Sequence, residues 1–179
     1  RQASVRCGLE ALAALNPEIV LIHDAVRPFV SSDAILRVVA DIDPQTGAIL
    51  ALPVADTLKR SDGDRIDATV DRSGLFGAQT PQGFPYGLIR EAHAKASRET
   101  RTAFTDDASI AEWAGIPVRL VAGDPENVKL TLARELTLAA ERFRGEPAMI
   151  DVRTGNGYDV HKLVPGDGVT LCGVWIEHD

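Results

Sequence analysis

The chain has 179 residues, which is enough for one α/β domain, or for one domain and part of another. Its net charge of −7 argues against nucleic-acid binding, because that function needs a basic surface. No apolar run approaches the roughly 18–20 residues that cross a bilayer, and the opening residues lack a signal-peptide pattern. Cys7 and Cys172 make no metal-ligand spacing and fit a reducing cytoplasm. We therefore expect a cytoplasmic globular protein without nucleic-acid or membrane partners.

Helix and strand patterns alternate along most of the chain. The expected elements are, in chain order, a helix over 4–15, a strand buried on both faces over 18–22, a helix capped by Ser31 or Ser32, a strand over 48–54, a hairpin over 58–70, helices over 86–97 and 106–113, a strand over 116–121 and a helix over 130–143. This alternation predicts a three-layer, Rossmann-like α/β domain with a mostly parallel sheet and a hairpin excursion.

The alternation stops after Phe143. A short segment rich in glycine and proline follows, and then a glycine-punctuated strand pattern begins. The sequence therefore predicts three parts. They are a first domain over 1–143, a linker over 144–151, and the first strands of a second α+β domain over 152–179.

Polar loops follow two of the predicted strands. One loop carries Asp24 and Arg27, and the other carries Lys129. Ligands of α/β sheets bind in such loops, at the carboxyl ends of strands. Asp24 could ligate a divalent cation, while Arg27 and Lys129 could hold phosphate groups. The alternatives are a turn-capping Asp24 in a structural salt bridge with Arg27, and an ordinary surface lysine at position 129.

The stretch 71–84 is denser in small and polar residues than a simple connector requires. We predict a rigid turn over 80–83, which offers backbone amides, the Thr80 hydroxyl and an amide side chain to a ligand. An ordinary turn would leave Arg72 and Gln82 without a role.

The last segment contains an Asp-x-His pattern, formed by Asp159 and His161. On an extended strand, residues i and i+2 project to the same face, so both side chains can reach one ion. Carboxylate and imidazole ligands suit zinc or a similar divalent metal in a catalytic site with an open position. Such pairs are also common by chance, and a third ligand would lie beyond Asp179 or in another chain.

Seven short stretches together resemble the 2-C-methyl-D-erythritol 4-phosphate cytidylyltransferase family over about 1–143. They are Arg-Gln-Ala-Ser-Val at 1–5, His-Asp-Ala-Val-Arg-Pro at 23–28, Asp-Thr-Leu-Lys-Arg at 56–60, Val-Asp-Arg-Ser-Gly-Leu at 70–75, Gln-Thr-Pro-Gln-Gly-Phe at 79–84, Phe-Thr-Asp-Asp-Ala-Ser at 104–109 and Glu-Asn-Val-Lys at 126–129.

A second resemblance covers 153–177 and points to the opening of the 2-C-methyl-D-erythritol 2,4-cyclodiphosphate synthase family. It is carried by Gly-Tyr-Asp-Val-His at 157–161 and Leu-Cys-Gly-Val at 171–174. Asn156 stands where that family often has His. The two families in this order resemble the fused bifunctional enzyme of non-mevalonate isoprenoid synthesis.

These resemblances imply two reactions. The first domain would transfer a cytidylyl group from CTP to 2-C-methyl-D-erythritol 4-phosphate and release pyrophosphate. The second would carry out a metal-dependent cyclisation that forms 2-C-methyl-D-erythritol 2,4-cyclodiphosphate and releases CMP. The implied site residues are Asp24 beside CTP and Mg²⁺, Ser4 at the cytidine nucleotide, Arg27 as a further substrate-binding residue, Arg72 and Lys129 on the methylerythritol phosphate, and Thr57 and Thr80 as secondary contacts. In the second domain they are Asp159 and His161, on Zn²⁺ or another divalent ion.

The resemblance also implies a homo-oligomer, in which the hairpin reaches a neighbouring subunit, so that Arg72 and Thr57 serve the neighbour's site. The glycine-rich CTP loop of the family has no counterpart in the chain, so we expect a fragment of a longer protein that is inactive by itself. Two other functions stay open. One is a nucleotidyltransferase that activates a hexose phosphate, and the other is a non-catalytic binding or scaffold module.

Overall fold

The computed structural model describes residues 2–99, 103–131, 135–136, 139–140, 168–171 and 174–177. The chain divides into two compact units, 1–149 and 150–179. The elements of the first unit are α1 (Gln2–Ala11), β1 (Ile19–Ile22), α2 (Ser32–Asp41), β2 (Gly47–Pro53), β3 (Leu58–Asp62), β4 (Arg65–Val70), β5 (Phe76–Pro85), α3 (Tyr86–Ala96), α4 (Asp107–Trp113) and β6 (Val118–Ala122). The second unit contains β7 (Gly168–Leu171) and β8 (Val174–Glu177), which pair antiparallel.

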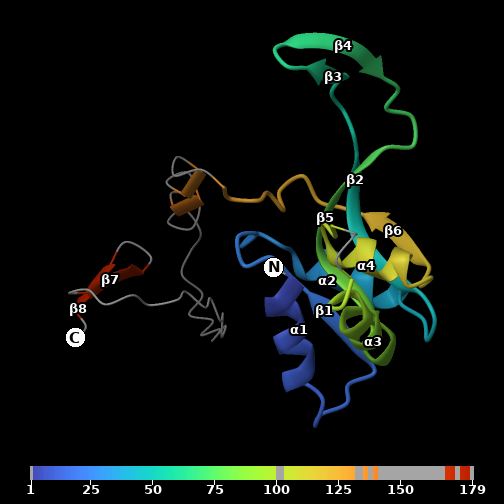
Figure 1. Cartoon of the computed structure of the whole chain (residues 1–179), viewed down its shortest axis with the longest axis vertical. Helices are drawn as coiled ribbons and strands as arrows, with labels where there is room; N and C mark the ends of the chain where they lie inside the picture. The colour runs from blue at the N-terminus through green and yellow to red at the C-terminus, as the bar shows by residue number, and fades with distance from the viewer. Residues whose placement is uncertain are drawn as a thin grey trace. The chain divides into compact units, whose positions relative to one another are not determined.

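Four strands of the first unit form a sheet in the order β1-β5-β2-β6 (Figure 1). β5 runs antiparallel to β1 and β2, whereas β2 and β6 are parallel neighbours. β1, β2 and β6 therefore run in one direction, and β5 is the reversed strand of this described sheet. The predicted α/β class is confirmed. The sheet is mixed, because the reversed strand lies between two strands of common direction.

Helices cover both faces of the sheet because successive residues of β2 point to opposite sides. On one side, Ile49 belongs to an apolar cluster with residues of α1, α3 and α4. On the other side, Ala48 and Leu50 pack in a second cluster with Ala34 and Val38 of α2. The result is the predicted arrangement of three layers.

The hairpin over 58–70 is confirmed as β3 and β4, which pair antiparallel. Its turn contains Gly63 with a φ of +60°, a backbone conformation that glycine adopts without steric cost. The hairpin extends from the end of β2, and the chain returns from it into β5 (Figure 1).

The predicted turn over 80–83 is wrong, because these residues lie inside β5, an inner strand of the sheet. Gly83 is buried between β1 and α2, and a Cβ placed there would lie 2.5 Å from Ile42 Cδ1 and 2.8 Å from Leu21 Cδ2. Large side chains of neighbouring elements therefore fill the space around small residues of β5. Strand patterns based on apolar side chains do not reveal such a strand.

The strand over 18–22 was expected to be buried on both faces, and this expectation is also wrong. All four residues of β1 are half-buried. β1 lies at the end of the strand order, and in the described part of the chain it pairs with β5 alone. The predicted helix over 130–143 lies largely outside the described residues.

Candidate active site

Polar residues from four separate segments line a cavity of about 150 Å³. The segments are the loop after β1, the middle of β5, the start of α4 and the loop after β6. Since β1 and β6 run in the same direction, their carboxyl ends meet at one edge of the sheet, where α/β proteins bind ligands. The lining residues are Asp24, Arg27, Ala78, Gln79, Thr80, Gln82, Thr105, Asp106 and Lys129.

A bulge in β5 directs two of these residues toward the cavity. β2 residue Ile49 pairs with Gln82 and Ala51 pairs with Ala78, so one β2 residue lies opposite three residues of β5. Bulges of this kind reorient side chains next to active sites. The bulge carries Gln79 and Thr80, whose exposed fractions are only 7% and 4%.

Thr80 fixes the loop after β1 through its hydroxyl. The Asp24 backbone N–H donates to Thr80 Oγ1 at 3.0 Å, and Thr80 Oγ1 lies 3.0 Å from His23 Nδ1. His23 Nε2 lies 2.9 Å from the Arg27 carbonyl, which only accepts. The Nε2 atom of a neutral His23 therefore carries the proton, and the Thr80 hydroxyl donates to Nδ1. This chain of bonds holds Asp24 and Arg27 in place.

Three charged side chains meet at one edge of the cavity. Asp24 Oδ2 lies 3.4 Å from Lys129 Nζ and 3.8 Å from Arg27 Nε. Arg27 Nη1 also donates to the Asn127 carbonyl at 2.7 Å. The Lys129 side chain is 48% exposed, against 12% for Arg27 and 18% for Asp24. The lysine can therefore turn toward an incoming anion while the other two keep their positions.

Buried amide side chains hold the loop after β6, which carries Lys129. Gln79 accepts from the Asp124 N–H at 3.1 Å and donates to the Asp124 carbonyl at 2.9 Å. Asn127, which is fully buried, donates to the Thr80 carbonyl at 2.8 Å. Sequence reasoning gave no role to Gln79 or Asn127. Their position next to predicted site loops was the only signal in the sequence. The sequence pattern does not show which polar residues near such loops are buried.

Four of the predicted site residues thus come together at this cavity, namely Asp24, Arg27, Thr80 and Lys129. Ser4 lies exposed in α1, and Thr57 lies exposed just before β3. Neither lines the cavity. Asp159 and His161 lie outside the described residues.

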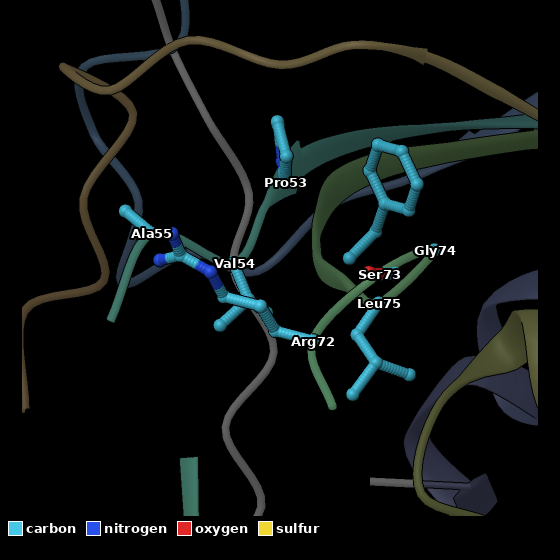
Figure 2. Close-up of a pocket in the computed structure, with 8 residues that line it drawn as sticks. Pro53, Val54, Ala55, Arg72, Ser73, Gly74 and Leu75 are labelled. Carbon is cyan, nitrogen blue, oxygen red and sulfur yellow. The ribbon is translucent and has the colours of Figure 1, made fainter. Parts of the chain in front are cut away.

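Arg72 lines a different and larger cavity, of about 480 Å³, at the base of the hairpin. Figure 2 shows its side chain extending along Val54 toward Ala55. The Leu75 N–H donates to the Arg72 carbonyl at 2.9 Å, which closes a turn in which Gly74 has a φ of +75°. Within this chain, Arg72 does not line the cavity that contains Asp24 and Lys129.

Asp71 begins the turn that presents Arg72. The Ser73 N–H donates to Asp71 Oδ1 at 2.9 Å, and this hydrogen bond lowers the pKa of the Asp71 carboxyl below its usual value. The carboxylate is exposed and stays charged down to acidic pH, one residue away from the guanidinium.

In the described part of the chain, no three His, Cys, Asp or Glu side chains gather into a metal-binding cluster. None of the helices described there is long and apolar enough to span a membrane.

The family model for 2-C-methyl-D-erythritol 4-phosphate cytidylyltransferase (IspD) matches residues 1–144. The chain belongs to this family. Among solved structures, the cytidylyltransferase of this family from Thermus thermophilus has a TM-score of 0.70 and 40% identity, and the match covers 80% of this chain and 69% of that one. The predicted family resemblance is thereby confirmed.

Curated relatives of this IspD family member match along its whole length. The protein named "Bifunctional enzyme IspD/IspF" from Mesorhizobium japonicum is 60% identical, over 100% of this chain and 44% of its own length. The protein of the same name from Allorhizobium ampelinum is 58% identical, again over 100% and 44%. The bifunctional IspDF structure from Campylobacter jejuni has a TM-score of 0.62 at 26% identity, covering 76% of this chain and 33% of that one. The chain thus spans about half the length of the curated relatives it matches.

Proposed function

We propose that the first unit transfers a cytidylyl group from CTP to 2-C-methyl-D-erythritol 4-phosphate, in the cytoplasm and within isoprenoid precursor synthesis. The observation that carries the proposal is the single cavity shared by Asp24, Arg27, Thr80 and Lys129 at the carboxyl edge of the sheet. Membership of the IspD family supplies the substrate pair.

The proposed reaction needs positioning and charge neutralisation rather than covalent catalysis. A phosphate oxygen of the acceptor attacks the α-phosphorus of CTP, the new P–O bond forms, and the bond to the β-phosphate breaks to release pyrophosphate. Lys129 binds the acceptor phosphate as a mobile positive charge. Arg27, held by the Asn127 carbonyl, adds a fixed positive charge beside it.

Asp24 suits a Mg²⁺ ion that is held mainly by its substrate. Mg²⁺ usually keeps several waters and takes one or two protein carboxylates together with substrate phosphates. The Asp24 carboxylate at the cavity wall matches this requirement, since its backbone is fixed by Thr80. When bound, the ion would neutralise charge on the phosphates of CTP. Thr80 keeps the carboxylate at the wall.

Arg72 and Thr57 are proposed to act in the site of a neighbouring subunit, so that the enzyme is a homo-oligomer. Arg72 is exposed at the base of a hairpin whose strands pair with each other, and it lines a cavity of its own. A guanidinium there can clamp a phosphate that another subunit presents. Ser4, exposed in α1, is proposed to contact the cytidine nucleotide.

We further propose that the domain boundaries follow the sequence pattern, with a cytidylyltransferase domain over 1–143, a linker over 144–151 and the start of a cyclodiphosphate synthase domain over 152–179. Asp159 and His161 would then bind Zn²⁺ or another divalent ion together with a third ligand outside the chain. Full-length relatives named as bifunctional support this proposal. The variant His161→Ala of the protein at its natural length should lose its stoichiometric metal in elemental analysis; retention of the metal would refute this role.

The proposed transfer is tested with the protein at its natural length and a panel of sugar phosphates. Release of pyrophosphate should require CTP and 2-C-methyl-D-erythritol 4-phosphate together. Faster turnover with a hexose phosphate would favour the other nucleotidyltransferase function, and no turnover with any acceptor would favour a scaffold. In the variant Asp24→Asn, which keeps the shape and removes the charge, turnover at saturating substrate should fall and its Mg²⁺ dependence should change. If both match the parent, Asp24 is only a turn residue.

A further inference from the structure

A buried amide side chain holds one wall of the cavity. Gln82, in β5, is only 1% exposed and lines the cavity. Its Nε2 donates to Asp106 Oδ2 at 2.9 Å, and its Oε1 accepts from the backbone N–H groups of Asp107 at 3.1 Å and Ala108 at 3.0 Å. A carboxylate can only accept and an N–H can only donate, so these partners fix the orientation of the Gln82 amide.

These bonds also determine what α4 presents to the cavity. The Ser109 N–H donates to Asp106 Oδ1 at 2.8 Å, so the first three backbone N–H groups of α4 all have acceptors within the protein. The helix start therefore offers no free N–H for a phosphate. Instead, Asp106 and Thr105 line the cavity there.

A second buried pair fastens the same helix start from behind. His93 Nε2 of α3 lies 3.0 Å from Asp107 Oδ1, and the two side chains are 0% and 1% exposed. The segment that carries Thr105 and Asp106 is thus tied to β5 through Gln82 and to α3 through His93. These contacts are additional to the N-cap that Asp106 itself provides.

We propose that Gln82 is a positioning residue that sets the Asp106 carboxylate and the Thr105 hydroxyl to receive hydroxyl groups of a phosphorylated polyol. A carboxylate has about four lone-pair sites. Asp106 uses two of them for Gln82 and Ser109, so it can still accept from a substrate hydroxyl. Lys129 lines the same cavity and would bind the phosphate of that molecule. The inference rests on the proposed function. It assigns recognition of the polyol to the side of the cavity formed by Gln82, Asp106 and Thr105.

The test uses Gln82→Glu in the protein at its natural length, with Gln82→Met as the uncharged comparison. At pH 8 the introduced carboxylate faces Asp106 and repels it, so the hydrogen bond between the two side chains is lost. KM for the methylerythritol phosphate should then rise about tenfold, which corresponds to the loss of one charged hydrogen bond. KM for CTP should stay within about twofold, which is below the effect of one hydrogen bond.

A pH profile separates positioning from a merely structural role. Burial and the neighbouring Asp106 charge raise the pKa of the introduced carboxyl. Its protonated form can again donate to Asp106 and accept from Asp107 and Ala108. KM of Gln82→Glu should therefore fall back toward the wild-type value as the pH is lowered, whereas Gln82→Met should show a raised KM without this relief. Gln45→Glu, which adds the same charge at an exposed turn, should leave KM unchanged.

Should Gln82→Met fail to fold, the double variant Gln82→Glu, Asp106→Asn tests the positioning role in its place. This double variant keeps the hydrogen bond between side chains 82 and 106, but residue 106 now donates and residue 82 accepts. Because the bond is partly restored, KM of the double variant at pH 8 should lie at least about threefold below that of Gln82→Glu. Unchanged KM in both single variants overturns the inference, as does an equal rise of KM for both substrates without relief at low pH. A wild type without cytidylyl transfer overturns the proposed function and the inference with it.

Discussion

The glycine that follows β6 leaves no room for a side chain, which makes Gly123→Ala an informative change. The Gly123 N–H donates to the Ala51 carbonyl at 2.9 Å, so the backbone lies close to β2. A Cβ at this position would lie 2.7 Å from Gln79 Oε1, 2.9 Å from Ala51 O and 3.0 Å from Ala51 C. Two of these atoms belong to the backbone of an inner strand. The Gln79 amide is therefore the group that moves most easily, and the contact with Ala51 O requires residue 123 itself to shift as well.

The cost follows from what that amide holds. Gln79 makes two hydrogen bonds to the backbone of Asp124, at 3.1 and 2.9 Å. Each contributes about 1 kcal/mol, and overpacking a filled site costs about 1–3 kcal/mol. We expect Gly123→Ala to lower the free energy of unfolding by roughly 3–5 kcal/mol. We also expect it to loosen the loop that carries Lys129, so that KM for the acceptor phosphate rises even under conditions where the variant is folded.

Urea unfolding and steady-state kinetics check both parts. Gly77→Ala is the matched control, because the nearest atom to its Cβ would be Leu52 O at 3.9 Å, an ordinary van der Waals distance. Equal unfolding free energies for the two variants would refute the steric argument. A destabilised Gly123→Ala with an unchanged KM would show that Gln79 does not hold Lys129 in position.

Three further predictions concern other parts of the fold. Arg72→Lys keeps the charge but loses the bidentate fork, so cytidylyl transfer should fall strongly while the proposed cyclisation stays intact; equal loss of both activities would indicate misfolding. Tyr86→Phe removes the hydroxyl that donates to the Leu9 carbonyl at 2.8 Å in a buried site, and urea unfolding should show a loss of about 1–3 kcal/mol. Asp71 has a lowered pKa because of the Ser73 N–H, so its stabilising contribution is present above the unfolded-state pKa and is lost as the pH falls through the folded-state pKa. Asp71→Asn, which keeps the accepting oxygen, should remove this part of the acid dependence of unfolding; an unchanged pH profile would contradict it.

Elements with a strong side-chain pattern could be predicted from the sequence. The hairpin, the helix capped by Ser31 and the strand that became β2 were found because apolar periodicity and turn residues mark them. Asp24 and Lys129 could also be placed in one site, since loops after strands of common direction meet at one edge of a sheet. This grouping could be predicted because it needs only the local strand pattern and the general rule on where loops of a parallel sheet meet.

β5 could not be predicted in the same way. Its buried part consists largely of small and polar residues, and its burial comes from large side chains elsewhere, such as Ile42 and Leu21 around Gly83. The bulge that turns Gln79 and Thr80 toward the cavity depends on the register with β2, which no local pattern encodes. The role proposed for Arg72 would require a neighbouring subunit, and a single chain does not show it.

The geometry of the cavity also helps to distinguish the two interpretations of Asp24 and Arg27, as ligand-binding residues or as a structural salt bridge. The Asp24–Arg27 pair is loose at 3.8 Å, and because both side chains are largely buried, the cost of removing their charges from water offsets much of their attraction. Yet three buried polar residues form hydrogen bonds that hold the two loops carrying these charges, namely Thr80, Gln79 and Asn127. Apolar residues at these buried positions would serve stability as well, without the cost of burying polar groups. The arrangement is therefore better explained by preorganisation of charged side chains for a ligand, which requires supporting residues fixed by hydrogen bonds, than by a structural salt bridge.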